Sequence, residues 1–176
     1  MPAQISKELA LARIAEESRP PGCLMCSILA SPSSRVLERG RGVTTLLNAY
    51  PLTWGHAVVV IDRHATRYTD VDAETAAESM RLIHAVARRI ELSLAPMRVF
   101  VASLGSVRED LTMTSPHLHW HVVPVVSGSA RAAEVLTWER GVLEGTADEW
   151  TAIQALLGAD EEGADETPSA RHRPHR

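Results

Sequence analysis

Apolar and polar positions along this chain change their spacing from segment to segment, and the changes mark out strands and helices. The runs 43–47 and 57–61 are rich in β-branched residues, and the second is apolar throughout, which predicts two strands, the second of them buried. From Thr69 to Leu94 apolar residues recur at three- and four-residue steps, which predicts one long helix capped by Thr69 or Asp72. The same patterns predict strands at 99–102 and 117–126, a helix at 5–17, and a helix at 147–157 capped by Thr146.

This order of elements predicts the fold class and the organisation of the chain. The strands are not regularly separated by crossover helices, so we expect an α+β domain with antiparallel pairing. We expect residues 1–21 to form an N-terminal helical extension and residues 22–158 to form the main domain with a C-terminal helical segment. Residues 159–176 are acidic and then rich in Pro and Arg, which predicts a disordered tail.

The charge and the hydropathy argue against several classes of function. A net charge of −4 argues against a broad surface for nucleic-acid polymers, which usually carries clustered Lys and Arg. No apolar run approaches the length that spans a bilayer, and the charged N-terminal segment does not resemble a signal peptide. We therefore expect a cytoplasmic protein that binds neither membranes nor nucleic-acid polymers.

Three histidines alternate with apolar residues in the predicted strand 117–126. Side chains at i, i+2 and i+4 of a strand share one face, so His117, His119 and His121 line up while the residues between them face the core. Such a face indicates a functional site, and the residues alone are compatible with two kinds of chemistry. Two neighbouring rings and a ligand from elsewhere suit zinc, whereas a single ring suits nucleophilic attack at phosphorus.

The run His117-Leu-His-Trp-His-Val-Val-Pro124 resembles the motif that defines the histidine triad (HIT) family of nucleotide hydrolases and transferases. A second block from Asn48 to His64 resembles the strand-loop-strand that precedes this motif in the family. The resemblance covers approximately residues 22–126. It implies a HIT-like fold with an antiparallel sheet of about five strands, one long helix and extra terminal helices, assembled as a homodimer.

The resemblance also implies catalytic roles for three histidines. His119, the middle histidine of the motif, would attack the α-phosphorus and form a nucleotidyl-histidine intermediate. His121 would donate a hydrogen bond to a phosphate oxygen or to the bridging atom, and His56 would complete the cluster from a neighbouring strand. Substrates of this kind include a phosphoramidate, a dinucleoside polyphosphate or a nucleotide sugar, with a purine as the expected base.

Four other positions match the substrate contacts of the family. Asn48 lies where an acidic or amide residue binds the ribose hydroxyls, and Asn offers both a donor and an acceptor to a diol. Thr114 matches a Ser or Thr that contacts the phosphate, and the backbone amides of Thr114 and Ser115 help to hold the anion. Ser103 stands at the position that is usually Asn.

Cys23 and Cys26 are the two cysteines of the chain, three residues apart. A zinc ion bound to both thiolates still needs two ligands. His64 and His117 match the residues that supply them in a related bacterial branch of the family, so the resemblance implies a structural zinc at these four residues. Inert buried thiols are the alternative, and no organic cofactor is expected.

The chain departs from the family pattern on the side where the leaving group would lie. Thr112 and Met113 replace a frequent Gly-Gln pair, Val125 replaces a common Arg, and the loop around 108–110 is longer. Two rival functions follow from these departures and from the histidine strand. One is a mononuclear metalloenzyme that uses His117 and His119, and the other is a nucleotide-binding, zinc-stabilised module without catalysis.

Overall fold

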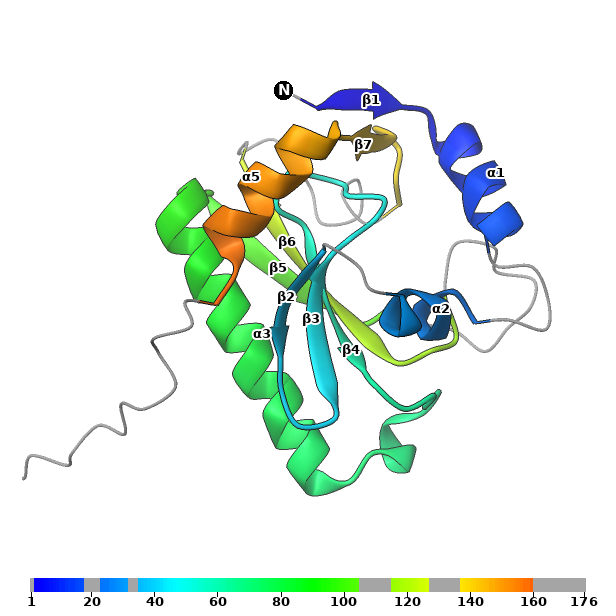
Figure 1. Cartoon of the computed structure of the whole chain (residues 1–176), viewed down its shortest axis with the longest axis vertical. Coiled ribbons are helices and arrows are strands. Elements are labelled where there is room, and N and C mark those ends of the chain that lie inside the picture. Colours follow the sequence, from blue (N-terminus) through cyan, green and yellow to red (C-terminus); the bar gives the residue numbers. More distant parts are fainter. Residues whose placement is uncertain (1, 18–22, 32–34, 105–114, 127–136, 160–176) are drawn as a thin grey trace, which may run out of the picture.

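Five antiparallel strands form the central sheet, in the order β2-β3-β4-β6-β5 (Figure 1). A computed structural model describes residues 2–17, 23–31, 35–104, 115–126 and 137–159. Within them the strands are β2 (Val36–Arg39), β3 (Val43–Leu47), β4 (Ala57–Ile61), β5 (Arg98–Ala102) and β6 (His119–Val125). All four pairings are antiparallel, as expected for strands that are not joined by regular crossover helices.

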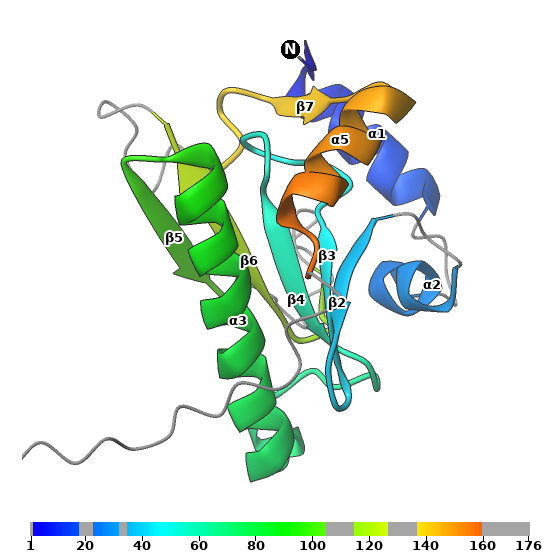
Figure 2. The ribbon, with the colours of Figure 1, turned by 60° about the vertical axis from the view of Figure 1, so that its left-hand side comes forward.

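The two faces of the sheet are covered by different helices, which Figures 1 and 2 show from two sides. Helices α3 (Ala73–Leu94) and α5 (Ala147–Leu157) pack on the face that carries Val59, Ile61 and Val122. The short helix α2 (Leu24–Ala30) packs on the opposite face against Leu46, Val58 and Val60. Both faces of β3 and β4 are therefore buried, which is why β4 is an uninterrupted apolar run and β3 has only uncharged residues.

The two packed helices begin where their sequences supply a cap. Asp72 accepts a hydrogen bond from the Thr75 backbone N–H at 2.8 Å and starts α3. Helix α3 ends at Ala95, which takes the left-handed conformation with φ of 45°. Thr146 and Glu149 form a reciprocal capping box at the start of α5.

A second, two-stranded sheet joins the beginning of the chain to its C-terminal part. Strand β1 (Ala3–Ile5) pairs antiparallel with β7 (Val142–Glu144), and α1 (Lys7–Glu17) follows β1 directly. Ala10, Tyr50 and Val142 form a small core beneath them. One 3-10 turn, Tyr68–Asp70, precedes α3.

The predicted α+β class with one five-stranded antiparallel sheet, one long helix and extra terminal helices is confirmed. The strands 43–47 and 57–61 and the helix 147–157 have the predicted bounds. The first helix begins at Lys7 because residues 3–5 form β1, and the histidine strand begins at His119 rather than at position 117. The predicted domain boundaries stay predictions, and residues 160–176 of the expected tail lie outside the described residues. Among the described residues, no helix is both long and apolar enough to cross a membrane.

Candidate functional site

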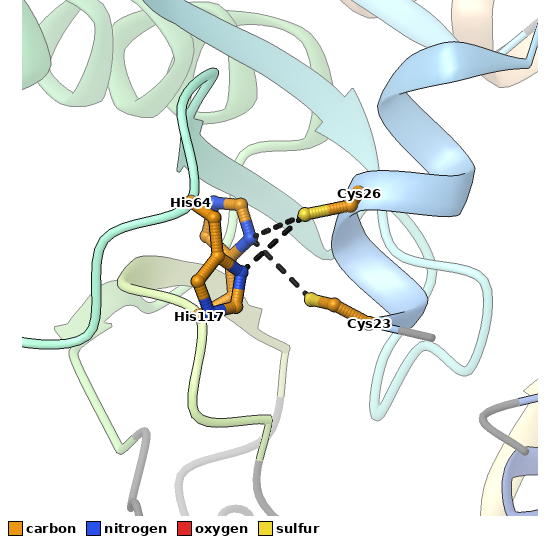
Figure 3. A group of neighbouring side chains, drawn as sticks. All are labelled: Cys23, Cys26, His64 and His117. Carbon is orange, nitrogen blue, oxygen red and sulfur yellow. Dashed lines mark hydrogen bonds between the residues drawn. The ribbon is translucent and has the colours of Figure 1, made fainter. Parts of the chain in front are cut away.

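Two cysteines and two histidines from separate segments meet beside the sheet (Figure 3). Cys23 precedes α2, Cys26 lies in its first turn, His64 follows β4, and His117 precedes β6. One ligand atom from each residue lies within 4.8 Å of the other three. The four residues that the sequence assigned to a metal are thus together, and they form a potential zinc site.

The distances in this cluster suit a tetrahedral zinc ion. Nδ1 of His117 lies 3.5 Å from Sγ of Cys23 and 3.4 Å from Sγ of Cys26, and Nδ1 of His64 lies 3.4 Å from the Cys26 sulfur. Zinc bonds of about 2.3 Å to sulfur and about 2.05 Å to nitrogen, at tetrahedral angles, separate sulfur from nitrogen by about 3.6 Å. The residues present therefore fit the metal in both chemistry and spacing.

Two features of the surroundings favour a cation between these ligands. The other ring nitrogen of His117, Nε2, donates to the Ile61 carbonyl oxygen at 2.6 Å, which leaves the Nδ1 lone pair toward the sulfurs. Burial, with a smaller effect from Cys23, raises the pKa of the Cys26 thiol. A thiolate at this position therefore needs nearby positive charge, which a bound metal ion supplies.

A row of three imidazole rings lies next to this cluster, on β6 and just before β4. Nδ1 of His119 lies 2.6 Å from the backbone carbonyl oxygen of His117. A carbonyl only accepts hydrogen bonds, so Nδ1 carries the proton and Nε2 of neutral His119 keeps its lone pair. This Nε2 lies 3.1 Å from Nε2 of His121, which must then be the donor.

The other end of the row gives the same assignment independently. The backbone N–H of Leu52 only donates, and it donates to Nδ1 of His56 at 3.2 Å. Nε2–H of His56 then donates to Nδ1 of His121 at 3.0 Å, so the His121 proton lies on Nε2. Both ends of the row therefore require the same tautomers, and the donated protons point in one direction toward the lone pair of His119.

Burial keeps the rings of the row neutral. His56 is 1% exposed and His119 is 3% exposed. Burial lowers the pKa of both, and that of His56 lies well below the ordinary value of 6.5. Burial, followed by the neighbouring His119, lowers the pKa of His121 to about 3. Neutral imidazole is the nucleophilic form, so the row is suited to attack on an electrophile.

The residues expected to contact substrate lie near this row and make contacts within the protein. The side-chain amide nitrogen of Asn48 lies 3.3 Å from both ring nitrogens of His56, and its oxygen accepts from the Tyr50 N–H. Ser103 donates its hydroxyl to the carbonyl oxygen of His119 at 2.8 Å. The Ser115 hydroxyl accepts from the backbone N–H of His117 at 3.3 Å. Thr114 lies outside the described residues.

Two backbone groups of the site are not visible in the sequence pattern. The Leu52 amide fixes the tautomer of His56, and the His117 carbonyl fixes that of His119. Side-chain type carries no signal for such roles. Only the spacing of His117, two residues before His119, hints that its backbone and its ring serve different groups.

Comparison with protein families gives one family model, described as the HIT domain, that matches residues 30–127. An uncharacterized HIT-like protein of Mycobacterium tuberculosis is 29% identical over 110 residues, which make up 60% of this chain and 73% of that protein. An uncharacterized HIT-like protein of Mycoplasma genitalium is 23% identical over 111 residues, or 62% of this chain and 77% of that protein.

Solved structures share the fold at low sequence identity. A Hit-like protein involved in cell-cycle regulation from Bartonella henselae matches with a TM-score of 0.61 and 14% identity, over 79% of this chain and 96% of that chain. A zinc-bound histidine triad family protein from Mycobacterium smegmatis matches with a TM-score of 0.57 and 22% identity, over 77% of this chain and 92% of that chain.

Proposed function

Because this chain belongs to the HIT domain family, we propose that it is a nucleotide hydrolase or nucleotidyl transferase that acts through a covalent intermediate on His119. Its substrate is a nucleoside phosphate derivative, such as a phosphoramidate, a dinucleoside polyphosphate or a nucleotide sugar. The observation that carries the proposal is the tautomer of His119, whose Nδ1 proton is given to a carbonyl and whose Nε2 lone pair is left for attack.

The proposed reaction has two displacements at the α-phosphorus. In the first, Nε2 of His119 forms a bond to phosphorus as the bond to the leaving group breaks. Nε2–H of His121, now pointing at His119, turns to a phosphate oxygen or the bridging atom as charge develops there. In the second, water or another acceptor attacks phosphorus, and the bond to His119 breaks to release the nucleotide.

His56 and Asn48 act around this step in the proposal. His56 is too buried to meet substrate, and its contact with Nδ1 of His121 makes it a positioning residue that keeps the His121 proton on Nε2. Asn48 is half-buried beside it and would turn its amide to the ribose hydroxyls when substrate binds.

The metal in the proposal is a structural zinc bound by the four-residue cluster. Four protein ligands complete a tetrahedral zinc and leave no open position for water or substrate, which is the pattern of structural sites. The ion would hold the segments before α2 and β6 together. This arrangement speaks against a metalloenzyme that uses His119, whose lone pair faces His121 instead of the cluster.

Incubation with an adenosine phosphoramidate tests the covalent step. We expect an acid-labile nucleotidyl adduct in the wild type and in His84→Ala, because His84 is exposed on α3, and none in His119→Ala. An adduct that persists in His119→Ala overturns the assignment of the nucleophile. If nucleotide binds but neither adduct nor product forms with any leaving group, the chain is a binding module without catalysis.

We also propose that the chain forms a homodimer in a reducing compartment such as the cytoplasm. Strand β5 is an edge of the central sheet, and Val101 on it is 47% exposed. Met97 before it and Val126 after β6 are exposed as well, and an apolar sheet edge of this kind invites pairing. A reducing compartment keeps the two cysteines as thiols that can bind the metal.

A further inference from the structure

A cavity of about 320 Å³ opens beside the end of β3, lined by residues other than the histidines of the row. Its apolar lining residues include Ile28, Leu46, Leu47 and Leu143. The volume lies in the range of small-molecule sites, which combine an apolar lining with a few polar groups.

Much of the cavity wall comes from segments outside the family match at 30–127. Helix α1 supplies Arg13 and Glu17, β7 supplies Glu144, and α5 supplies Trp150. Figure 1 shows α1, β7 and α5 gathered at the same end of the central sheet. The cavity wall therefore combines residues of the matched domain with residues from outside it.

The polar groups in the wall are charged and held in place. Tyr50, only 8% exposed, donates its hydroxyl to Glu17 at 2.7 Å and so fixes that carboxylate. Arg13 pairs with Glu144 at 2.5 Å. The guanidinium of Arg35 lies 4.5 Å from the centre of the Trp150 ring. The negative charge of Glu17 also interacts electrostatically with this guanidinium.

The register of the sheet relates this cavity to the catalytic face. His121 pairs with Val58, and Val58 pairs with Leu46, so these three side chains share one face on adjacent strands. Two strand spacings of about 4.8 Å separate Leu46 from His121 by roughly 10 Å. A nucleotide spans such a distance between its α-phosphate and its base. Leu47 and Ala49, the neighbours of Asn48, also line the cavity.

We propose that this cavity binds the base of the nucleotide and selects guanine, with Glu17 and Arg35 as the specificity-determining residues. This inference rests on the proposed function of the histidine row. Guanine presents adjacent N–H donors to a carboxylate and carbonyl and ring-nitrogen acceptors to a guanidinium, whereas adenine pairs best with an amide side chain. Among the described residues that line the cavity, none is Asn or Gln. A carboxylate has about four lone-pair sites and the Tyr50 hydroxyl uses one of them, so Glu17 has the capacity to accept both donors of the base.

Calorimetric titration of the full chain with GMP, AMP and IMP tests this assignment without turnover. We expect GMP to bind at least about tenfold more tightly than AMP, and IMP, which lacks the 2-amino group, to lie between them. Glu17→Gln should weaken GMP by about tenfold or more and leave AMP within about twofold. Glu16→Gln, the same change one residue away and outside the lining, should keep the GMP preference.

Two further variants keep the test decisive if Glu17→Gln unfolds. Arg35→Lys keeps the charge but loses the planar fork, so it should also reduce the GMP preference. Ala49→Leu fills the cavity and should weaken GMP and AMP together. Equal affinities for GMP and AMP in the wild type overturn the base assignment while leaving the His119 adduct assay untouched. If neither monophosphate binds, this inference fails, and the His119 adduct assay still decides the proposed function separately.

Discussion

Two groups of histidines lie side by side in this molecule, and hydrogen bonds place the proton on different ring nitrogens of His117 and His119. In the metal cluster, His117 gives its Nε2 proton to the Ile61 carbonyl and turns Nδ1 toward the sulfurs. In the row, His119 gives its Nδ1 proton to the His117 carbonyl and keeps its lone pair on Nε2. The residue type is the same, so the carbonyl that each ring meets decides which nitrogen remains for chemistry.

One residue belongs to both groups. The ring of His117 lies in the cluster, while its carbonyl oxygen orients the first ring of the row. A change in the cluster should therefore reach the row through the backbone of His117, whereas a change in the row should leave the cluster intact. This asymmetry can be tested at each position.

The largest effect is expected from removing the end of the row. His119→Asn keeps a polar side chain but has no imidazole to attack phosphorus, so turnover of an adenosine phosphoramidate should fall on the order of 10⁴-fold or more. Metal content should stay the same, because His119 is outside the cluster. Steady-state kinetics and metal analysis measure the two, and loss of the metal would contradict the separation of the groups.

Removing a ligand of the cluster should affect both groups. Cys26→Ser should abolish stoichiometric metal binding and lower the free energy of unfolding by about 3 kcal/mol, which corresponds to a fall in Tm of about 10 °C. Turnover should also fall by about 10²-fold as His117 loses its position. Ser27→Ala, an exposed neighbour in α2, is the control. Full turnover in metal-free Cys26→Ser would show that the groups are independent.

His56 tests the other end of the row. His56→Leu removes the donor to His121 and should lower kcat by about tenfold to a hundredfold, because the His121 proton is no longer held on Nε2. His56→Gln keeps an N–H donor and should recover part of the loss. Nitrogen-15 spectra of His121 report its tautomer directly, and an unchanged tautomer in His56→Leu would contradict the positioning role.

The smallest effect is a difference in how stability depends on pH. Between pH 6.5 and about 3, His121 binds a proton in the unfolded chain but not in the folded one. The free energy of unfolding should therefore fall as the pH drops through this range. His121→Gln should reduce that slope by about 1.4 kcal/mol per pH unit. Urea unfolding at several acidic pH values measures both slopes, and equal slopes would place the His121 ring in contact with solvent.

The sequence predicted the strands and helices that have a clear hydrophobic pattern or a cap. It did not predict the short elements, among them two strands that pair across a long stretch of sequence. The strand 57–61 and the helix 147–157 were visible because one is a β-branched apolar run and the other carries its own cap. Helix α2 is a short segment that contains Cys26, and β2 has mixed polarity because it lies at a sheet edge. Strands β1 and β7 have three residues each, too few to show a period.

Residue types together with the family resemblance predicted the members of the site, and the structure brings the four metal-binding candidates together. They could not predict the direction of the hydrogen bonds in the row, because that direction is set by the Leu52 amide and the His117 carbonyl. Nor did they indicate the cavity near Tyr50, whose charged walls come from opposite parts of the chain.

The pairing of β1 with β7 also orders events during synthesis. Arg13 and Glu144, which face each other across the cavity wall, are 131 residues apart in the sequence. At about 5–20 residues per second, Arg13 is synthesised about 7 to 26 s before Glu144. The histidine row and the metal ligands all precede Glu144 in the chain. A nascent chain can therefore bind its metal and form the histidine row before the wall of the cavity is complete. The proposed preference for guanine would then arise only after these two sites have formed.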